Sequence, residues 1–289
     1  MLKIKGILKQ NNSASKLVVL LGITCVTTLC SVILWKICTD GNSENIDNLK
    51  LLQLLQSFGL FILPPFILTY LFYEKPTEAL HLTKKISVKE SLLVVVFMIL
   101  IIPIINLLTA WNQQLILPQA FHDIEVWMRM AESETAAITE KMVQVHSLQA
   151  LSYNLFLMAL LPAMGEELFF RGTLQSFFAK KNTHRAIWIT AFIFSTIHFQ
   201  FYGFLPRLLL GAFFGYLLVK CGSLWLPIIG HFINNAMAII FYYLKFNGYQ
   251  SFDVDKIGTG ETIWVSCLVA ILLITVSIRY NTNRIKTLT

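Results

Sequence analysis

Charged residues are scarce in this chain of 289 residues: they make up 13% of it, against 56% hydrophobic residues. A soluble domain carries about a quarter charged residues. The shortage, together with a mean hydropathy of +0.65, excludes an ordinary soluble protein and indicates a membrane protein. The net charge of +7 comes from Lys and Arg placed between apolar runs. We therefore expect a lipid bilayer as partner and no nucleic acid.

Cysteine pairs, metal-protease motifs and repeats are also missing. None of the five cysteines forms a CxxC pair, so neither a disulfide scaffold nor a Cys-type zinc site is expected. The chain has no HExxH pattern, the usual mark of a zinc protease helix. It has no internal repeat and no low-complexity tract, which argues against a transporter built from repeated halves.

Long apolar runs are abundant. A spanning helix needs about 20 apolar residues, and we count about eight such runs. The sequence thus predicts an all-α, polytopic transmembrane helix bundle with its active site inside the bundle. The predicted spans are residues 17–35, 51–73, 91–111, 148–179, 186–199, 204–219, 224–245 and 263–278. The more polar stretch 112–145 has apolar residues at helical spacing, which predicts an amphipathic helix at the membrane surface.

Basic residues indicate the orientation. They precede the first span, follow the second and fourth, and fill the C-terminal tail, whereas the intervening loops are poorer in bases. The positive-inside rule then predicts that both termini are cytoplasmic, in agreement with an even number of spans. The first apolar run is too long for a cleaved signal peptide and is expected to stay as a span. We expect a multi-pass protein of the cell membrane, of the bacterial inner-membrane type.

Polar residues that are costly inside a membrane cluster in the second half of the chain. Glu166 and Glu167 are adjacent acids within an apolar run, and Arg171 follows Glu167 by four residues. This spacing places Glu167 and Arg171 on one helical face as an ion pair. Glu166 points about 100° away and can face the bundle interior. Taken alone, the cluster also fits an interfacial ion pair at a helix end.

Two further motifs follow at similar depth. His198 ends the segment from Phe194, and His231 lies four residues before Asn235, on the same helical face. Counted from the nearest basic loop, Glu166, His198 and His231 all lie about 15–20 Å deep at 1.5 Å per residue. We therefore expect them to form one site. Taken singly, His198 fits a core histidine, and His231 with Asn235 fits an interhelical hydrogen-bonding pair.

These residue types suit hydrolysis of an amide bond. Glu166, helped by His198, is a candidate base that takes a proton from water. His231 and Asn235 are candidate donors to the oxyanion that forms. Ser195 points to another face and has no evident base, so a serine nucleophile is not expected.

A metal is the competing interpretation. Glu166, His198 and His231 have the ligand types of a catalytic divalent metal such as zinc, with an open position for water. Glu167 would then be the general base. Because no HExxH pattern supports it, the metal hypothesis rests on residue types only. The residues leave the two mechanisms open.

The three motifs in this order resemble those of the CAAX-protease and bacteriocin-processing family, which includes the type II CAAX prenyl endopeptidases. They are EExxxR at 166–171, FxxxH at 194–198 and HxxxN at 231–235, within a resemblance that covers about 148–245. The resemblance implies an intramembrane endopeptidase whose first Glu and first His activate water. The implied catalytic residues are Glu166, His198, His231 and Asn235, with Glu167 and Arg171 in support. The family has been described both as metal-dependent and as glutamate-dependent.

The expected function is therefore hydrolysis of a peptide bond in a peptide or membrane-anchored protein. The alternative is a bacteriocin self-immunity protein, or a non-catalytic partner-binding protein of the same fold. The sequence predicts neither the identity of the substrate nor an oligomeric state. We expect three parts: N-terminal spans with the amphipathic helix, a catalytic core, and a last span with a basic tail. Their bounds are 1–147, 148–246 and 247–289.

Overall fold

The computed structural model describes residues 5–8, 12–179, 182–250 and 253–286, and over these ranges the chain forms helices and no strand. Five helical segments are long and apolar enough to cross a membrane. They are Ser13–Thr39, Ile46–Phe72, Leu148–Phe178, Phe201–Cys221 and Trp225–Phe246. The helices α5 (Val88–Leu100) and α6 (Ile102–Gln113) make a sixth if their 42° bend is counted within one span. The all-α, multi-pass membrane architecture is thus confirmed.

The count of eight spans is not confirmed. The fifth predicted span is the helix α11 (Thr183–Thr196), whose 14 residues fall short of the roughly 20 that cross a bilayer. The eighth lies in α14 (Ile263–Lys286), where the described residues give only a shorter apolar stretch, Gly260–Leu273, that begins in the turn before the helix. The described residues thus support five or six spans where the sequence predicts eight, because apolar composition alone does not show where a helix ends.

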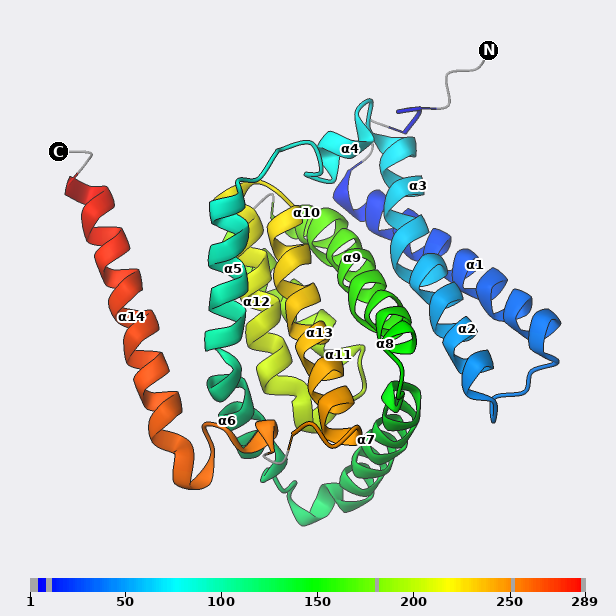
Figure 1. Cartoon of the computed structure of the whole chain (residues 1–289). Coiled ribbons are helices and arrows are strands. Elements are labelled where there is room, and N and C mark those ends of the chain that lie inside the picture. Colours follow the sequence, from blue (N-terminus) through cyan, green and yellow to red (C-terminus); the bar gives the residue numbers. More distant parts are fainter. Residues whose placement is uncertain (1–4, 9–11, 180–181, 251–252, 287–289) are drawn as a thin grey trace.

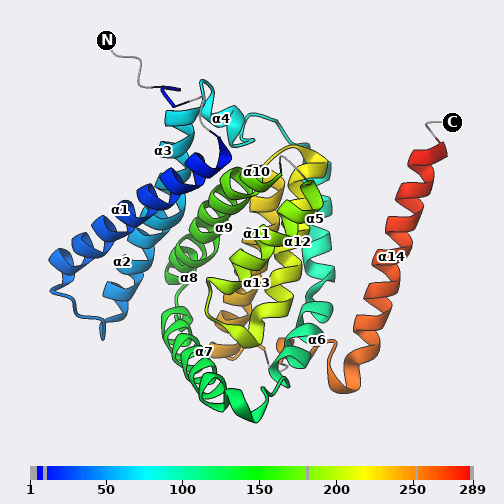
Figure 2. The same cartoon turned by 180° about the vertical axis from the view of Figure 1, so that it is seen from behind.

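The second half of the chain forms an upright bundle at the centre of the molecule (Figure 1). The hairpin of α1 (Ser13–Thr39) with α2 and α3 leans away on one side, and α14 stands on the other, as Figures 1 and 2 both show. The start of α1 and the end of α14 lie at the same end of the bundle. The remaining bounds are α2 Ile46–Gln56, α3 Leu63–Phe72, α4 Pro76–Ala79, α7 His122–Val143, α8 Leu148–Asn154, α9 Leu161–Glu167, α10 Gln175–Phe178, α12 Phe204–Cys221 and α13 Trp225–Phe246.

Wider π-helical turns interrupt two of the long helices without breaking them. One, η1 (Ser57–Ile62), joins α2 to α3 directly before Pro64 and Pro65. Two others, η3 (Leu155–Leu160) and η4 (Leu168–Leu174), join α8, α9 and α10 into one span. Such turns are rare in proteins, and those that occur are often found at functional sites. Here the last of them follows the two adjacent acids.

The helix α7 crosses the end of the bundle opposite to the start of α1 (Figure 1). It is the helix predicted for the more polar stretch 112–145, and it is not among the candidate spans. Its Glu132 Oε2 accepts a hydrogen bond from the backbone N–H of Tyr202 at 2.8 Å, and the ring of Trp127 lies 5.6 Å from that of Phe201. Helix α7 therefore holds the loop that follows α11.

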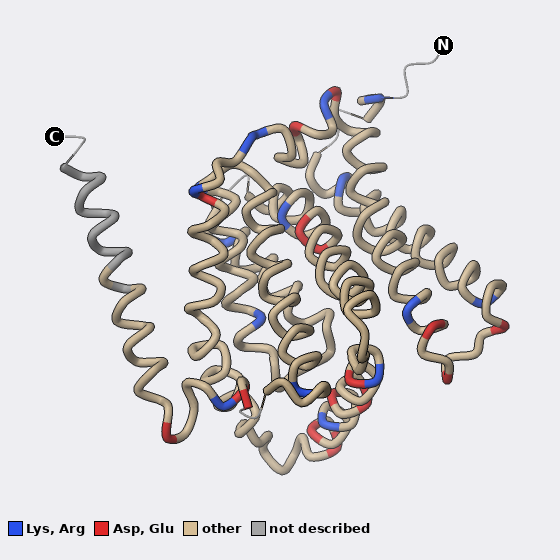
Figure 3. Tube along the Cα trace, in the orientation of Figure 1, with Lys and Arg blue, Asp and Glu red and all other residues tan. Residues whose placement is uncertain are grey.

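The charges divide between the two ends of the bundle (Figure 3). Lys and Arg gather around α4 and the start of α1, whereas many of the acids lie on α7. This division matches the charge asymmetry that predicts cytoplasmic termini. The orientation itself stays a prediction, as does the division of the chain into three parts.

Candidate active site

A buried ion pair forms the base of the site. Arg171 Nη1 lies 2.8 Å from Glu167 Oε1, and both side chains are fully buried. This is the pair that their spacing of four residues predicts. Arg171 Nη2 also donates to the carbonyl of Gly211 at 2.9 Å. His231 Nδ1 lies 2.9 Å from the same Glu167 oxygen. The ion pair thus links α9 to α13 through Glu167 and to α12 through Arg171.

Two aromatic rings and a glycine pack around the ion pair. The Arg171 guanidinium lies 4.6 Å from the centre of the Phe194 ring, at cation–π distance. The ring of Phe214 stacks on that of His231 at 5.4 Å and 18°. A Cβ at Gly211 would lie 3.2 Å from Arg171 Nη2, so a glycine there lets the guanidinium reach the backbone. We call the residues Glu167, Arg171, Phe194, Gly211 and Phe214 the support layer.

His198 lies outside the helix in which it was predicted. Helix α11 ends at Thr196, and Phe199 has a positive φ of 52°, so the chain turns away directly after the histidine. His198 Nδ1 donates to the carbonyl of Phe194 at 2.7 Å, which explains the FxxxH spacing. Because a carbonyl only accepts, Nδ1 carries the proton, and Nε2 of the neutral ring has a lone pair. Ser195 Oγ donates to the carbonyl of Phe204 at 2.7 Å and has a structural contact instead.

Glu166 faces two imidazoles. Its Oε2 lies 3.8 Å from Nε2 of His198 and 3.8 Å from Nε2 of His231. These separations are longer than a hydrogen bond. Oε2 is buried and has no hydrogen-bond partner among the described residues. A group this close to two histidines and without a bond of its own suits a water molecule that bridges them.

The amide group of Asn235 can donate hydrogen bonds. Its Oδ1 accepts a hydrogen bond from Asn234 Nδ2 at 3.3 Å, and this orientation turns Nδ2 of Asn235 away from Asn234. His231 presents Nε2, since Nδ1 is used on Glu167. Asn234 was not predicted as part of the site. Two adjacent asparagines in the sequence do not show which of them faces the site, and only the orientation of the helix decides this.

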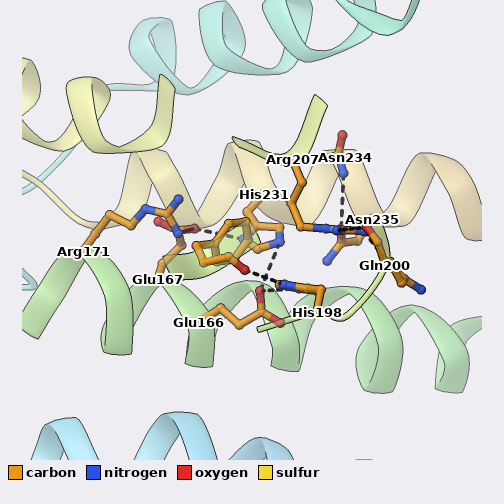
Figure 4. A network of polar contacts seen from close by, with 10 residues as sticks. Glu166, Glu167, Arg171, His198, Gln200, Arg207, His231, Asn234 and Asn235 are labelled. Carbon is orange, nitrogen blue, oxygen red and sulfur yellow. Dashed lines mark hydrogen bonds and ion pairs between the residues drawn. The ribbon is translucent and has the colours of Figure 1, made fainter. Parts of the chain in front are cut away.

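A cavity of about 740 Å³ brings the four predicted catalytic residues together. Glu166, His198, His231 and Asn235 line it (Figure 4). Residues of α2 and α7 form other parts of its wall, so it extends toward the α7 end of the bundle. Gln200 and Arg207 also line it and were missed. A basic residue within a predicted span was the signal that points to Arg207.

A second cavity of about 660 Å³ meets the same two catalytic groups. Glu166 and His198 line it too, and apolar residues of α1, η1, η4 and α11 make up most of its wall. Leu17, Leu20 and Phe170 are among them. The carboxylate of Glu166 thus lies between this apolar cavity and the first one, which we call the polar cavity because Gln200, Arg207, His231 and Asn235 also line it.

The predicted zinc ligands do not have the arrangement of a metal site. Among the residues that the structure describes, no group of three or more His, Cys, Asp or Glu side chains is placed to hold a metal ion. Ligands of tetrahedral zinc, bound at about 2.0–2.1 Å, lie about 3.4 Å apart. Glu166 Oε2 lies 3.8 Å from both histidine nitrogens. The residue types suit zinc and their present spacing does not.

Residues 148–237 match the family described as type II CAAX prenyl endopeptidase Rce1-like. This segment is therefore similar to the CAAX proteases of that family, over somewhat less than a third of the chain. The match holds all six predicted site residues, from Glu166 to Asn235. Comparisons with curated proteins and with solved structures gave no match. The Rce1-like family implies a hydrolase that acts on peptide bonds within a membrane.

Proposed function

We propose that this protein is an intramembrane endopeptidase that uses Glu166 and His198 to activate water. The surroundings of Glu166 carry this proposal. Among the described residues that line the polar cavity it is the only acid, and two imidazole nitrogens flank it at 3.8 Å. A carboxylate in this position is a suitable general base.

The reaction uses protein groups in two roles. A water molecule bonded to Glu166 Oε2 and His198 Nε2 gives a proton to Glu166, and its oxygen adds to the scissile carbonyl carbon. His231, protonated on both nitrogens, and Asn235 donate hydrogen bonds to the resulting oxyanion. When the C–N bond breaks, the leaving amine takes the proton from Glu166. The products are a carboxylic acid and an amine.

The pair of cavities supports a substrate that is anchored in the membrane. A peptide segment fits the polar cavity, which extends from Glu166 toward α7. The apolar cavity suits a membrane-embedded or lipid-bearing part of the same substrate, because its wall is almost entirely hydrocarbon. The family's description as a prenyl endopeptidase points in the same direction.

Glu166→Gln tests the mechanism. The variant keeps size and shape but cannot take a proton, so cleavage of a lipid-anchored peptide library by purified protein should fall at least about a hundredfold. Glu134→Gln, at an exposed acid on α7, is the matched control and should cleave normally. Full cleavage by Glu166→Gln would overturn the assignment. Loss of wild-type cleavage with a chelator, restored by zinc, would favour a metal mechanism instead.

The non-catalytic alternative has its own readout. If the protein acts only by binding a partner, Glu166→Gln should leave its effect in the host cell intact while purified protein cleaves nothing. The proposed orientation, with both termini in the cytoplasm, is tested separately by reporter fusions to each end. A reporter active only outside the cytoplasm should stay silent at both.

A further inference from the structure

Arg207 is a basic residue in the wall of the catalytic cavity. It lies near the start of α12, and it lines the same cavity as Glu166, His198 and Asn235. Its Nη2 donates to Gln200 Oε1 at 2.6 Å and its Nη1 to the Gln200 carbonyl at 3.2 Å. Figure 4 shows the two side chains together beside the catalytic groups. The guanidinium is thus fixed on the loop that carries His198.

The charge of Arg207 has no close counterion. No carboxylate lies within 4.0 Å of it among the described residues. Glu166 and Glu132 interact with it electrostatically from farther away. Neither carboxylate forms a salt bridge with Arg207: Glu166 is the proposed base, and Glu132 Oε2 accepts the Tyr202 N–H. The two bonds to Gln200 go to neutral oxygens, so they orient the charge without neutralising it.

The geometry of a guanidinium favours one class of ligand. Arg has five N–H donors in a planar fork, and Gln200 takes two of them. The other donors match a carboxylate, which can accept two parallel hydrogen bonds. A neutral peptide carbonyl presents a single oxygen to the fork and would leave the charge uncompensated.

We propose that Arg207, oriented by Gln200, binds a carboxylate of the substrate and makes the enzyme selective for anionic peptides. This inference rests on the proposed endopeptidase function. It adds a specificity-determining residue outside the three motifs. The carboxylate comes either from the free C-terminus of the peptide or from an Asp or Glu side chain.

Matched peptides distinguish the two sources. A lipid-anchored peptide that the wild-type protein cleaves is made in three forms: with a free C-terminus, with a C-terminal amide, and with each Asp or Glu replaced by Asn or Gln. A charge-assisted hydrogen bond predicts that removing the bound carboxylate raises KM about tenfold to a hundredfold. The form with the raised KM identifies the source, and kcat should change less.

Variants at position 207 test whether Arg207 is the residue that recognises the carboxylate of the substrate. Arg207→Gln should cleave the charged and neutral forms with nearly equal KM, and Arg207→Lys should keep part of the preference. Arg185→Ala, at an exposed arginine outside the cavity, should behave as wild type. A merely structural role for Arg207 would weaken cleavage of both forms equally. That result, or a wild-type enzyme indifferent to the charge, overturns the inference.

Binding separates this inference from the proposed function. Binding of the same peptides to the Glu166→Gln protein is measured without turnover. If no peptide is cleaved by the wild type but the charged form binds at least about tenfold more tightly, and Arg207→Gln abolishes the difference, the carboxylate site stands and the endopeptidase proposal fails. Equal binding of charged and neutral forms overturns the site. If Arg207→Gln does not fold, wild type and Arg207→Lys still decide the outcome.

Discussion

Two adjacent acids belong to two different regions: Glu167 to the support layer and Glu166 to the wall of the polar cavity, which we call the cavity wall. The two acids differ in the partners that compensate their charge. Glu167, in the support layer, is fully buried and receives Arg171 and His231 on one oxygen. The side chain of Glu166, in the cavity wall, is 11% exposed, and its Oε2 has no hydrogen-bond partner among the described residues. One residue of helical rotation, about 100°, separates the two environments.

This difference assigns different physical roles to the two regions. A buried ion pair that loses one partner leaves an uncompensated charge, so the support layer should govern folding and the position of His231. In the cavity wall, Glu166 Oε2 has no hydrogen-bond partner among the described residues, so this wall should govern chemistry and substrate binding with little effect on stability. Variants that affect both properties equally would contradict the division.

Arg171→Gln should have the largest effect on stability. It leaves Glu167 ionised and buried with His231 alone, and breaking such a pair costs about 3–5 kcal/mol. The free energy of unfolding in detergent measures this loss. Lys75→Gln breaks another short acid–base pair, with Glu78, whose side chains are 72% and 52% exposed. That control should change little, because water already solvates both groups. Equal effects would contradict the buried role of Arg171.

Asn235→Ala should affect activity and leave the fold largely intact. Losing one oxyanion donor lowers kcat about a hundredfold to a thousandfold, and the side chain is only half-buried. Steady-state cleavage kinetics measure the loss, and thermal unfolding checks the fold. Asn234→Ala should cost less, because Asn234 bonds to Asn235 at 3.3 Å and only orients it. A larger loss in Asn234→Ala would move the oxyanion role to that residue.

The sequence predicted the local features of the site better than its surroundings. The Glu167–Arg171 pair and the shared face of His231 and Asn235 follow from helical spacing, which is fixed by the backbone. The position of His198 beyond α11 was missed because a positive φ at Phe199 is not visible in an apolar run. Arg207 was missed because one charge barely changes the hydropathy of a segment. The bonds from His231 and Gly211 to the ion pair are contacts between distant helices, and sequence spacing does not determine them.

Gly211→Ala should disturb the support layer moderately. The new Cβ would lie 3.2 Å from Arg171 Nη2 and 3.2 Å from Ala191 Cβ, and such overpacking costs about 1–3 kcal/mol. The free energy of unfolding and cleavage rates should fall together, since the guanidinium shifts. Gly22→Ala, on α1 with nothing within 4 Å of the new Cβ, is the control. It should be neutral or slightly stabilising, because Ala favours a helix.

The smallest expected effect lies outside both regions, at the start of α7. Hydrogen bonds from Arg129 and from the Leu117 N–H lower the pKa of Glu125 below its usual value. Ionised Glu125 therefore stabilises the fold fully above the pKa that Glu has in the unfolded chain, about 4.3. This stabilisation is lost as the pH falls through the lower pKa of Glu125 in the folded protein.

In that acidic range the start of α7 should loosen, while the buried ion pair of the support layer remains intact. Fluorescence of Trp127, taken as the difference from a Trp127→Phe variant, should report this transition because its ring packs 5.6 Å from Phe201. Glu125→Gln should lack the transition; if it titrates like wild type, another group controls the movement of α7.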